Sequence, residues 1–397
     1  MKTILFGGGF DPPHRGHERA LEALFALSPD RVIVLPSGKP PHKALSGGAD
    51  GEGRMAMCRA AFAREKVVFS DFDLKQEGKC YTYHTLTHFQ KEDPDGEILL
   101  YCGTDEFLSF ETWFRFEEIL KIATLAVMSR DGDEEVLAEK KARLEKAYHA
   151  RVLLLDEKPV MASSTEIREE IEKRGFSDSL SPGVNEIIAR RGFYGSRLNE
   201  RRGAVLDRIL SELDEERLSH TLGVERETVR LCELLDESPD DLRLAALLHD
   251  LTRRWRDEKQ IDFLREAGET VTGEDMASPA VLHGRSAALI AARDFGLDTV
   301  VCDAIRFHTT GRRGMTLPDK ILFFADLIEE TRRHEVCQKA RSHFYGGLPG
   351  DPAARLAWLD KCVRLALDGT VSHLQTEGKP VHSLTIGARD DLSRAPQ

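Results

Sequence analysis

The most informative feature of the sequence is a glycine-rich segment near the N-terminus that carries two histidines. It reads Gly7-Gly8-Gly9-Phe10-Asp11-Pro12-Pro13-His14-Arg15-Gly16-His17 and lies between an apolar run, Thr3–Phe6, and an amphipathic run, Glu18–Leu27. This order predicts a strand, a tight turn and a helix. The first turn of a helix presents free N–H groups and a partial positive charge, so it favours bound phosphate. His14 and His17 would add donors for the charge that develops on a transferring phosphoryl group.

Two familiar phosphate-binding loops are excluded by the same residues. The glycines are not followed by Lys and Ser or Thr, so the segment is not a Walker loop. Pro12 stands where the G-x-G-x-x-G turn of dinucleotide-binding proteins has its last glycine, so that turn is also a poor match. The alternative is a glycine-rich turn with incidental histidines. We favour the phosphate site because glycines, Pro-Pro and an H-x-x-H pair coincide at one strand–helix junction.

A second group of residues that could do chemistry lies in the C-terminal half. It consists of an isolated histidine, an adjacent His-Asp pair, two further histidines and an aspartate: His220, His249, Asp250, His283, His308 and Asp326. On separate helices such side chains can converge on a metal; imidazole suits iron, manganese or zinc, and carboxylates can bridge two ions. Asp250 follows the apolar run Leu244–Leu248, and a buried carboxylate needs a charge partner, for which a cation is suited. The alternative is that these histidines are ordinary core residues with hydrogen-bond partners. That explanation suits any one of them alone, but it does not account for the whole series.

The first half of the chain alternates strand-like and helix-like runs. The apolar runs are Thr3–Phe6, Arg31–Leu35, Val67–Phe69, Ile98–Tyr101, Leu125–Met128 and Val152–Leu155. Such alternation predicts an α/β fold with a parallel sheet covered on both faces, in which ligands bind just after the strands. Ser163-Ser164-Thr165 is typical of an N-cap cluster that opens a helix.

The pattern changes around Tyr194–Arg197, beyond which strand signals almost disappear. Helical periodicity covers Leu218–Leu235, Asp240–Arg256, Pro279–Phe295, Asp298–Phe307 and Pro318–Arg333. We therefore expect a first domain over residues 1–195, an all-α domain over residues 198–378, and a loosely ordered C-terminal tail over residues 379–397.

Composition limits the classes to which the chain can belong. Its 397 residues are 41% hydrophobic and 31% charged, which indicates a soluble globular protein of two or more domains. A net charge of −12 argues against nonspecific nucleic-acid binding. We expect no membrane span and no signal peptide, and hence a cytoplasmic location. The seven scattered cysteines form no C-x-x-C pair and indicate reduced, mostly buried thiols.

The glycine-rich segment resembles the G-x-F-[DN]-P-x-H-x-G-H signature of nucleotidyltransferases, specifically nicotinate-mononucleotide adenylyltransferases. Further segments resemble the family's later motifs in order: Leu35–Lys43, Tyr81–Leu86, Gly103-Thr104-Asp105 with Trp113, and Ala162–Arg168. The chain departs from the family at Gly9, often Thr or Ser, at His84, usually Asp, and at Ala162, usually Ile. The resemblance covers roughly the first half of the chain and implies a Rossmann-like parallel-sheet domain.

This resemblance implies attack by nicotinate mononucleotide on ATP, with magnesium carried on the triphosphate. His14 and His17 would contact the ATP phosphates, and Lys43 and Arg168 would be phosphate clamps. The remaining implied substrate-binding residues are Gly8, Gly9, Phe10 and Gly103; Thr82, Asp105 and Trp113 for the nicotinate nucleotide; and Ser163, Ser164 and Thr165 for ATP. Trp113 could instead be core and Lys43 a surface lysine. Within the same class, a pantetheine-phosphate adenylyltransferase is the alternative, which Pro-Pro-His-Lys and Tyr-Thr-Tyr disfavour.

The helical half resembles the HD phosphohydrolase superfamily, in particular its YqeK-type branch, which cleaves diadenosine tetraphosphate symmetrically to two ADP. The resemblance rests on these segments: Ala246–Asp250, Leu282-His283-Gly284, His308–Gly311 and Phe324–Glu329. Arg253 stands where the branch commonly has Lys, and Glu330 where it often has Pro.

The HD resemblance implies two transition-metal ions, iron, manganese or similar, that activate a hydroxide and polarise a phosphoryl oxygen. Asp250 would bridge the ions, with His220, His249 and Asp326 on one and His283 and His308 on the other. Arg306 and Arg332 are possible phosphate contacts; for Arg332 a surface role is an equal alternative. This half could otherwise be a nucleotide-binding regulatory module or a hydrolase of another nucleotide pyrophosphate.

Overall fold

Each apolar run predicted as a strand forms part of one parallel sheet. The strands are β1 (Lys2–Gly8), β2 (Arg31–Pro36), β3 (Val67–Phe69), β4 (Glu97–Gly103), β5 (Ala123–Met128) and β6 (Val152–Leu155). Their order is β3-β2-β1-β4-β5-β6, and every neighbouring pair is parallel. The α/β prediction for the first half is therefore confirmed.

The computed structural model describes residues 1–38, 48–128, 133–155 and 163–394. Lys43 and Ala162 lie outside the described residues. The chain divides into two compact units, Met1–Ser196 and Arg197–Gln397.

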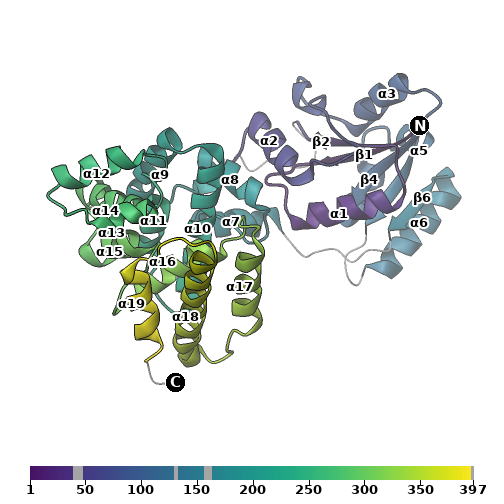
Figure 1. The fold of residues 1–397 in the computed structure, drawn as a ribbon. Helices are drawn as coiled ribbons and strands as arrows, with labels where there is room; N and C mark the ends of the chain where they lie inside the picture. The colour runs from purple at the N-terminus through teal and green to yellow at the C-terminus, as the bar shows by residue number, and fades with distance from the viewer. Residues whose placement is uncertain (39–47, 129–132, 156–162, 395–397) are drawn as a thin grey trace. The chain divides into compact units, whose positions relative to one another are not determined.

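Alternate side chains of the strands point to opposite faces of the sheet and pack into two separate apolar clusters, one on each face. Ile4 and Phe6 of β1 pack with α1 (Arg15–Ala26) and α2 (Gly51–Phe62). Leu5 packs on the opposite face. The helices there are α3 (Thr82–Glu92), α4 (Thr104–Leu108), α5 (Phe116–Ile122) and α6 (Glu134–Tyr148). Both faces are thus covered, as in Figure 1, because strands with apolar residues on both sides must bury both.

The described residues of this unit also form three short helical turns and two further helices. The 3-10 turns are Asp73–Lys75, Phe110–Thr112 and Phe193–Gly195. α7 (Ser164–Arg174) and α8 (Pro182–Arg191) pack with α2 through a third apolar cluster that includes Met57, Ile171 and Val184. α7 begins directly after Ser163, where the N-cap cluster was predicted.

The strand order reverses between β1 and β4, which lie side by side at the centre of the sheet. The loop after β1 leads to α1, and Gly103 at the end of β4 leads directly into α4. In open parallel sheets the carboxyl ends of such strands flank the crevice in which ligands bind. The fold therefore places the glycine-rich segment at the edge where a ligand is expected.

Among its described residues the second unit contains helices joined by turns and loops and no strand, which confirms the all-α prediction. Its helices are α9 (Glu200–Glu212), α10 (Glu215–Leu234), α11 (Asp240–Leu248), α12 (Asp257–Glu266), α13 (Gly273–Ala277), α14 (Leu282–Phe295), α15 (Thr299–Phe307), α16 (Leu317–Ile328), α17 (Glu335–Gly346), α18 (Pro352–Thr376) and α19 (Ser383–Leu392). A 3-10 turn, Pro279–Val281, precedes α14. Several starts are capped by side chains, as when Asp214 accepts from the amide of Arg217 at 2.9 Å.

Two helices are shorter than their periodicity predicts. α11 ends at Leu248, because Nδ1 of His249 bonds the carbonyl of Ala246 at 2.6 Å, the carbonyl that the amide of Asp250 would use in a longer helix. α16 ends at Ile328, because the Glu329 carboxylate accepts the amide of Thr331 at 2.6 Å and closes a local turn. The side chains that end these helices belong to the histidine–aspartate cluster described below.

The prediction of a loosely ordered tail after residue 378 is wrong. α19 packs against α18 and buries Thr385 and Ala388 (Figure 1). Glu274 accepts from the amide of Ser383 at 2.6 Å, which fixes the start of this helix. The segment is short and rich in charge, so its few buried positions give a weak periodic signal.

Replacing Ala388 with aspartate tests whether α19 is packed in solution. Ala388 has no exposed surface, so Ala388→Asp would bury an unpaired carboxylate and lower the free energy of unfolding of the second unit by about 1–3 kcal/mol. Thermal melting followed by calorimetry measures this change. Ala354→Asp, at an exposed position of α18, is the matched control. Equal melting temperatures for the two variants would contradict the packed helix.

Two expectations from composition can be compared with the structure. All seven cysteines are unpaired and buried, as expected for reduced thiols. Among the described residues, no helix combines the length and apolarity needed to cross a bilayer.

Candidate functional sites

The two histidines of the glycine-rich segment face each other at the start of α1. His14 is the N-cap residue, and its carbonyl accepts the amides of His17 at 2.8 Å and Glu18 at 3.1 Å. Its own amide donates to Nδ1 of His17 at 3.2 Å, and the two ring centroids are 3.8 Å apart. A neutral imidazole that accepts at Nδ1 carries its proton on Nε2. His17 is therefore held as a donor through Nε2.

The loop before these histidines is held by side chains from distant parts of the first unit. Arg54 of α2 donates to the carbonyl of Gly9 at 2.8 Å, and Arg168 of α7 donates to the carbonyl of Asp11 at 2.7 Å. The Tyr194 hydroxyl donates to Oδ1 of Asp11 at 2.6 Å. Arg54 and Asp11 are themselves buried, so the groups that hold the loop lie in the interior of the unit rather than at its surface.

Fewer groups of the glycine-rich loop are available to a ligand than the sequence predicts. Phe10 is 1% exposed and its ring packs edge-on to Phe6 and His17, so the ring is part of the core and does not face a ligand. A Cβ at Gly8 would come within 2.9 Å of this ring, which explains the glycine. The amide of Arg15, one of the N–H groups expected to be free, already donates to the Ser179 carbonyl at 3.0 Å.

The other predicted substrate-binding residues fall into two groups. Arg168 bonds Thr165 Oγ1 at 3.1 Å as well as the loop, so it brings the start of α7, with Ser163 and Ser164, to the glycine-rich segment. Gly103 is the N-cap of α4, and Asp105 is exposed in its first turn. Thr82 begins α3, and Trp113 packs against Phe110 at 5.1 Å, in the apolar cluster on the opposite face from Phe10.

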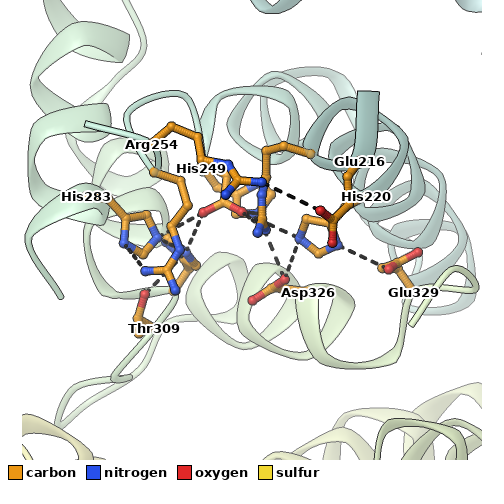
Figure 2. Close-up of polar contacts among 12 residues, drawn as sticks. Glu216, His220, His249, Arg254, His283, Thr309, Asp326 and Glu329 are labelled. Atoms are coloured by element: carbon orange, nitrogen blue, oxygen red, sulfur yellow. Dashed lines mark hydrogen bonds and ion pairs between the residues drawn. The ribbon is translucent and has the colours of Figure 1, made fainter. Parts of the chain in front are cut away.

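All six predicted metal-ligating residues converge in the second unit, from α10, α14, α16 and the ends of α11 and α15. They form three overlapping groups whose ligand atoms lie within 4.8 Å of one another: His220, His249, Asp250; His249, His308, Asp326; and Asp250, His283, His308. Figure 2 shows His220, His249 and Asp326 pointing toward one another, with Glu329 beyond the His220 ring.

The two oxygens of Asp250 face different histidines. Oδ2 lies 3.4 Å from Nε2 of His249 and 3.6 Å from Nε2 of His220. Oδ1 lies 2.9 Å from Nε2 of His283 and 3.9 Å from Nε2 of His308. Asp326 joins the first group, with Oδ1 3.0 Å from Nε2 of His220. One carboxylate thus lies between two sets of imidazoles, as a bridge between two cations requires.

The outward nitrogens of these histidines orient the rings. Nδ1 of His308 lies 2.7 Å from the Ile305 carbonyl, Nδ1 of His249 bonds Ala246, and Nδ1 of His220 lies 3.1 Å from Oε1 of Glu329. Such partners keep the proton on Nδ1 and leave Nε2 to bind a metal. Among the described residues, the buried Nε2 of His249 has no hydrogen-bond partner. A divalent cation would satisfy it, so the donor set fits a metal centre.

The titratable residues of this cluster shift one another's pKa values. Burial opposes charge on His220, but its bonds to Asp326 and Glu329 outweigh burial and raise its pKa to about 9, so a cation at Nε2 of His220 would have to displace a proton. Burial and the neighbouring His283 and His249 lower the pKa of His308 to about 3. Burial alone would raise the pKa of Asp250, yet the neighbouring imidazoles hold it well below the ordinary value. Both carboxylates, Asp250 and Asp326, are therefore anionic at neutral pH, since the pKa of Asp326 is also held well below the ordinary value.

Comparison with known proteins agrees with the geometry of the first unit. The cytidylyltransferase-like family model matches residues 5–170. A probable nicotinate-nucleotide adenylyltransferase of Clostridium novyi is 38% identical over 184 residues, which are 46% of this chain and 92% of that protein. The chain belongs to the nicotinate-nucleotide adenylyltransferase family. A second such relative, from Clostridium tetani, is 35% identical over 197 residues, or 49% of this chain and 98% of that protein.

This adenylyltransferase family member is about twice as long as those relatives, and its second half contains a different domain. The HD domain model matches residues 217–331, which include all six converging histidines and aspartates. A solved structure from Clostridium acetobutylicum, described as a predicted HD superfamily hydrolase involved in NAD metabolism, is 31% identical, with 49% of this chain and 97% of that chain covered and a TM-score of 0.44. The chain is an enzyme with a nucleotidyltransferase domain and an HD domain.

Several residues at the two sites of this adenylyltransferase chain received no role from the sequence. Arg217 and Glu329 each lie three residues from a predicted ligand, His220 and Asp326, and an i,i+3 search around those ligands could have found them. Arg54 and Tyr194 are far in sequence from the loop they hold, and no motif marks them. Arg306, expected as a phosphate contact, is instead bound to Glu269 at 2.8 Å.

Replacing Tyr194 with phenylalanine tests how the adenylyltransferase loop is anchored. Tyr194→Phe leaves a buried carboxylate without one of its donors, and we expect the free energy of unfolding of the first unit to fall by about 1.5–3 kcal/mol. Urea unfolding followed by Trp113 fluorescence, with Trp255 and Trp358 replaced by phenylalanine, reports on this unit alone. Tyr148→Phe, at an exposed tyrosine of the same unit, is the control. Identical urea midpoints would show that the bond adds no stability.

Proposed function

We propose that the first unit transfers the adenylyl group of ATP to nicotinate mononucleotide, giving nicotinate adenine dinucleotide and pyrophosphate. The observation that carries this proposal is the pair of facing imidazoles, His14 and His17, at a helix start beside the point where the strand order reverses. Family membership supports the same reaction. We assign this activity to residues 1–195 and the HD activity to residues 198–378, against which α19 (Ser383–Leu392) packs.

In this proposal the chain positions charge and donates hydrogen bonds. The 5′-phosphate of nicotinate mononucleotide is already an anion, so its attack on the α-phosphorus of ATP needs no general base. Nε2–H of His17, with His14, would donate to the phosphate oxygens, whose negative charge grows as pyrophosphate leaves. Arg168 and Lys43 would clamp the phosphates, and magnesium would enter with ATP.

The remaining roles divide between the two substrates. Backbone groups of Gly8, Gly9, Phe10 and Gly103 would line the phosphate path. Ser163, Ser164 and Thr165 would contact ATP, which the Arg168 bridge from α7 to the loop supports. Thr82, Asp105 and Trp113 would contact the nicotinate nucleotide.

Turnover with different acceptors tests this assignment. We expect nicotinate adenine dinucleotide and pyrophosphate in equal amounts from ATP and nicotinate mononucleotide, measured by chromatography. Nicotinamide mononucleotide and phosphopantetheine serve as competing acceptors. Faster turnover of phosphopantetheine would replace this assignment with a pantetheine-phosphate adenylyltransferase.

We propose that the second unit hydrolyses diadenosine tetraphosphate symmetrically, consuming one water and releasing two ADP. The observation that supports a two-ion centre is Asp250, whose oxygens face two separate pairs of histidines. His220, His249 and Asp326 would hold one ion, and His283 and His308 the other. The bound ions would supply a water-derived nucleophile at neutral pH and polarise the scissile phosphate.

The chain's own groups then orient these ligands. Glu329 and the carbonyls of Ala246 and Ile305 fix the histidine rings, so Nε2 of each faces inward. Arg332 lies against Asp326, within the cluster, and would contact the substrate phosphates.

Metal removal tests this second activity. Dialysis of the full chain against a chelator is expected to abolish ADP formation from diadenosine tetraphosphate, and iron or manganese is expected to restore it. Nicotinate adenine dinucleotide and a guanosine pyrophosphate are parallel substrates. Hydrolysis of one of these in preference would assign a different nucleotide pyrophosphate, and binding without hydrolysis of any would assign a regulatory module.

A further inference from the structure

Two arginines lie on the carboxylates that the proposed first ion requires. Nη1 of Arg217 is 2.7 Å from Oδ2 of Asp250, the oxygen that faces His220 and His249. Nη2 of Arg332 contacts Oδ1 of Asp326, and Nε of Arg332 donates to the carbonyl of the same residue at 2.6 Å. Each guanidinium thus neutralises a carboxylate oxygen that a cation would otherwise take.

The arrangement is one-sided. Oδ1 of Asp250, the oxygen facing His283 and His308, has no ion pair with arginine or lysine among the described residues. The nearby Arg253 reaches Nδ1 of His283 at 3.1 Å rather than a carboxylate. Among the described residues, arginine therefore pairs with carboxylate oxygens only in the half of the cluster that would hold the first ion.

The two arginines lie in or next to the helices that also carry predicted metal ligands. Arg217 lies in the first turn of α10, three residues before His220, so both side chains leave the same face of the helix. Its amide is capped by Asp214, which fixes its backbone. Arg332 follows α16 in the turn that Glu329 and Thr331 close, and Glu329 also orients His220. Movement of either arginine therefore requires no change in the ligand backbone.

We propose that Arg217 and Arg332 hold Asp250 and Asp326 in place without metal, yield these oxygens to a divalent cation, and then present their guanidinium groups to substrate phosphates. The inference rests on the metal centre of the proposed hydrolase function. A cation must displace two ion pairs before it binds, so its apparent affinity is reduced by the fraction of molecules in which the arginines remain in place. The released groups carry the charge and planar donors that suit phosphate.

Manganese titration of the metal-free full chain tests this competition without turnover. For Arg217→Gln and Arg332→Gln we expect the Kd for Mn²⁺ to fall by about 3- to 10-fold. In each variant the guanidinium group that competes with Mn²⁺ for a carboxylate oxygen has been removed. The melting temperature without metal should fall in both variants, and the KM for diadenosine tetraphosphate should rise while adenylyl transfer is unchanged. Arg254→Gln is the control, since Arg254 pairs with exposed Asp214 and Glu216 nearby.

The outcomes separate this inference from the proposed reaction. An unchanged or weaker Mn²⁺ affinity in both variants would overturn the inference even if the wild-type chain hydrolyses the dinucleotide. Tighter binding in the variants, with no hydrolysis by the wild type, would uphold the inference and refute the proposed substrate. A wild-type chain that binds no Mn²⁺ would overturn both.

Discussion

Replacing His17 with alanine is expected to lower the rate of nicotinate adenine dinucleotide formation by about 100- to 1,000-fold, the usual cost of removing one preorganised donor to developing charge. The reason is geometric: the amide of His14 holds Nδ1 of His17, so the proton on Nε2 is presented in a fixed direction. The loss should fall mainly on kcat, since the donor matters most when charge has built up on the phosphate oxygens. Steady-state kinetics with both substrates varied measures this split.

His149→Asn is the matched control for this change. His149 is an exposed residue of the first unit with a positive φ, a conformation that asparagine tolerates, so its replacement should leave kcat within about 2-fold. Hydrolysis of diadenosine tetraphosphate should be unaffected in both variants. A His17→Ala enzyme that retained more than a tenth of the wild-type kcat would remove His17 from the chemistry.

Replacing Asp250 with asparagine is expected to reduce ADP formation from diadenosine tetraphosphate by about 1,000-fold or more. The metal ions contribute several kcal/mol to such a reaction, and each 1.36 kcal/mol is about tenfold in rate. Asp250 is the residue whose two oxygens serve both groups of histidines, so the neutral amide should also lower the number of ions bound per chain. Metal analysis by mass spectrometry, beside kinetic assays, measures both effects.

Asp262→Asn is the control for this second prediction, because Asp262 is an exposed carboxylate of α12. It should retain both the metal content and the hydrolytic rate of the wild type. Full metal content in Asp250→Asn would contradict the bridging role, whatever its activity.

The parts predicted well from the sequence are those with local or repeated signals. Thr3–Phe6 and the later apolar runs became strands because a parallel sheet buries both faces and so needs continuous apolar residues. His249 and Asp250 could be selected because they interrupt an apolar helical run, and His220 and Asp326 because they complete an ordered series of histidines and aspartates. The start of α7 after Ser163 was predicted from the preference of serine and threonine for helix starts, although the Ser163 side chain makes no capping hydrogen bond.

The parts that sequence reasoning missed depend on tertiary contacts between unmarked residues. Tyr194 and Arg54 reach the loop across 183 and 45 positions of the chain, and neither lies in a motif. The early end of α11 depends on a side-chain bond of His249 that competes with helix continuation. Arg306 has the charge needed to bind phosphate, but its ion pair with Glu269 follows from the packing of the helices and has no signal in the sequence.

The central claim is that one chain contains two separate centres, one built on paired imidazoles and the other on a histidine–aspartate cluster. The most direct measurement assays both products, nicotinate adenine dinucleotide and ADP, in the full-length His17→Ala and Asp250→Asn proteins. We predict that each variant loses one activity and keeps the other within about 2-fold of the wild type. Loss of both activities in either correctly folded variant, or of neither in both, would contradict the claim.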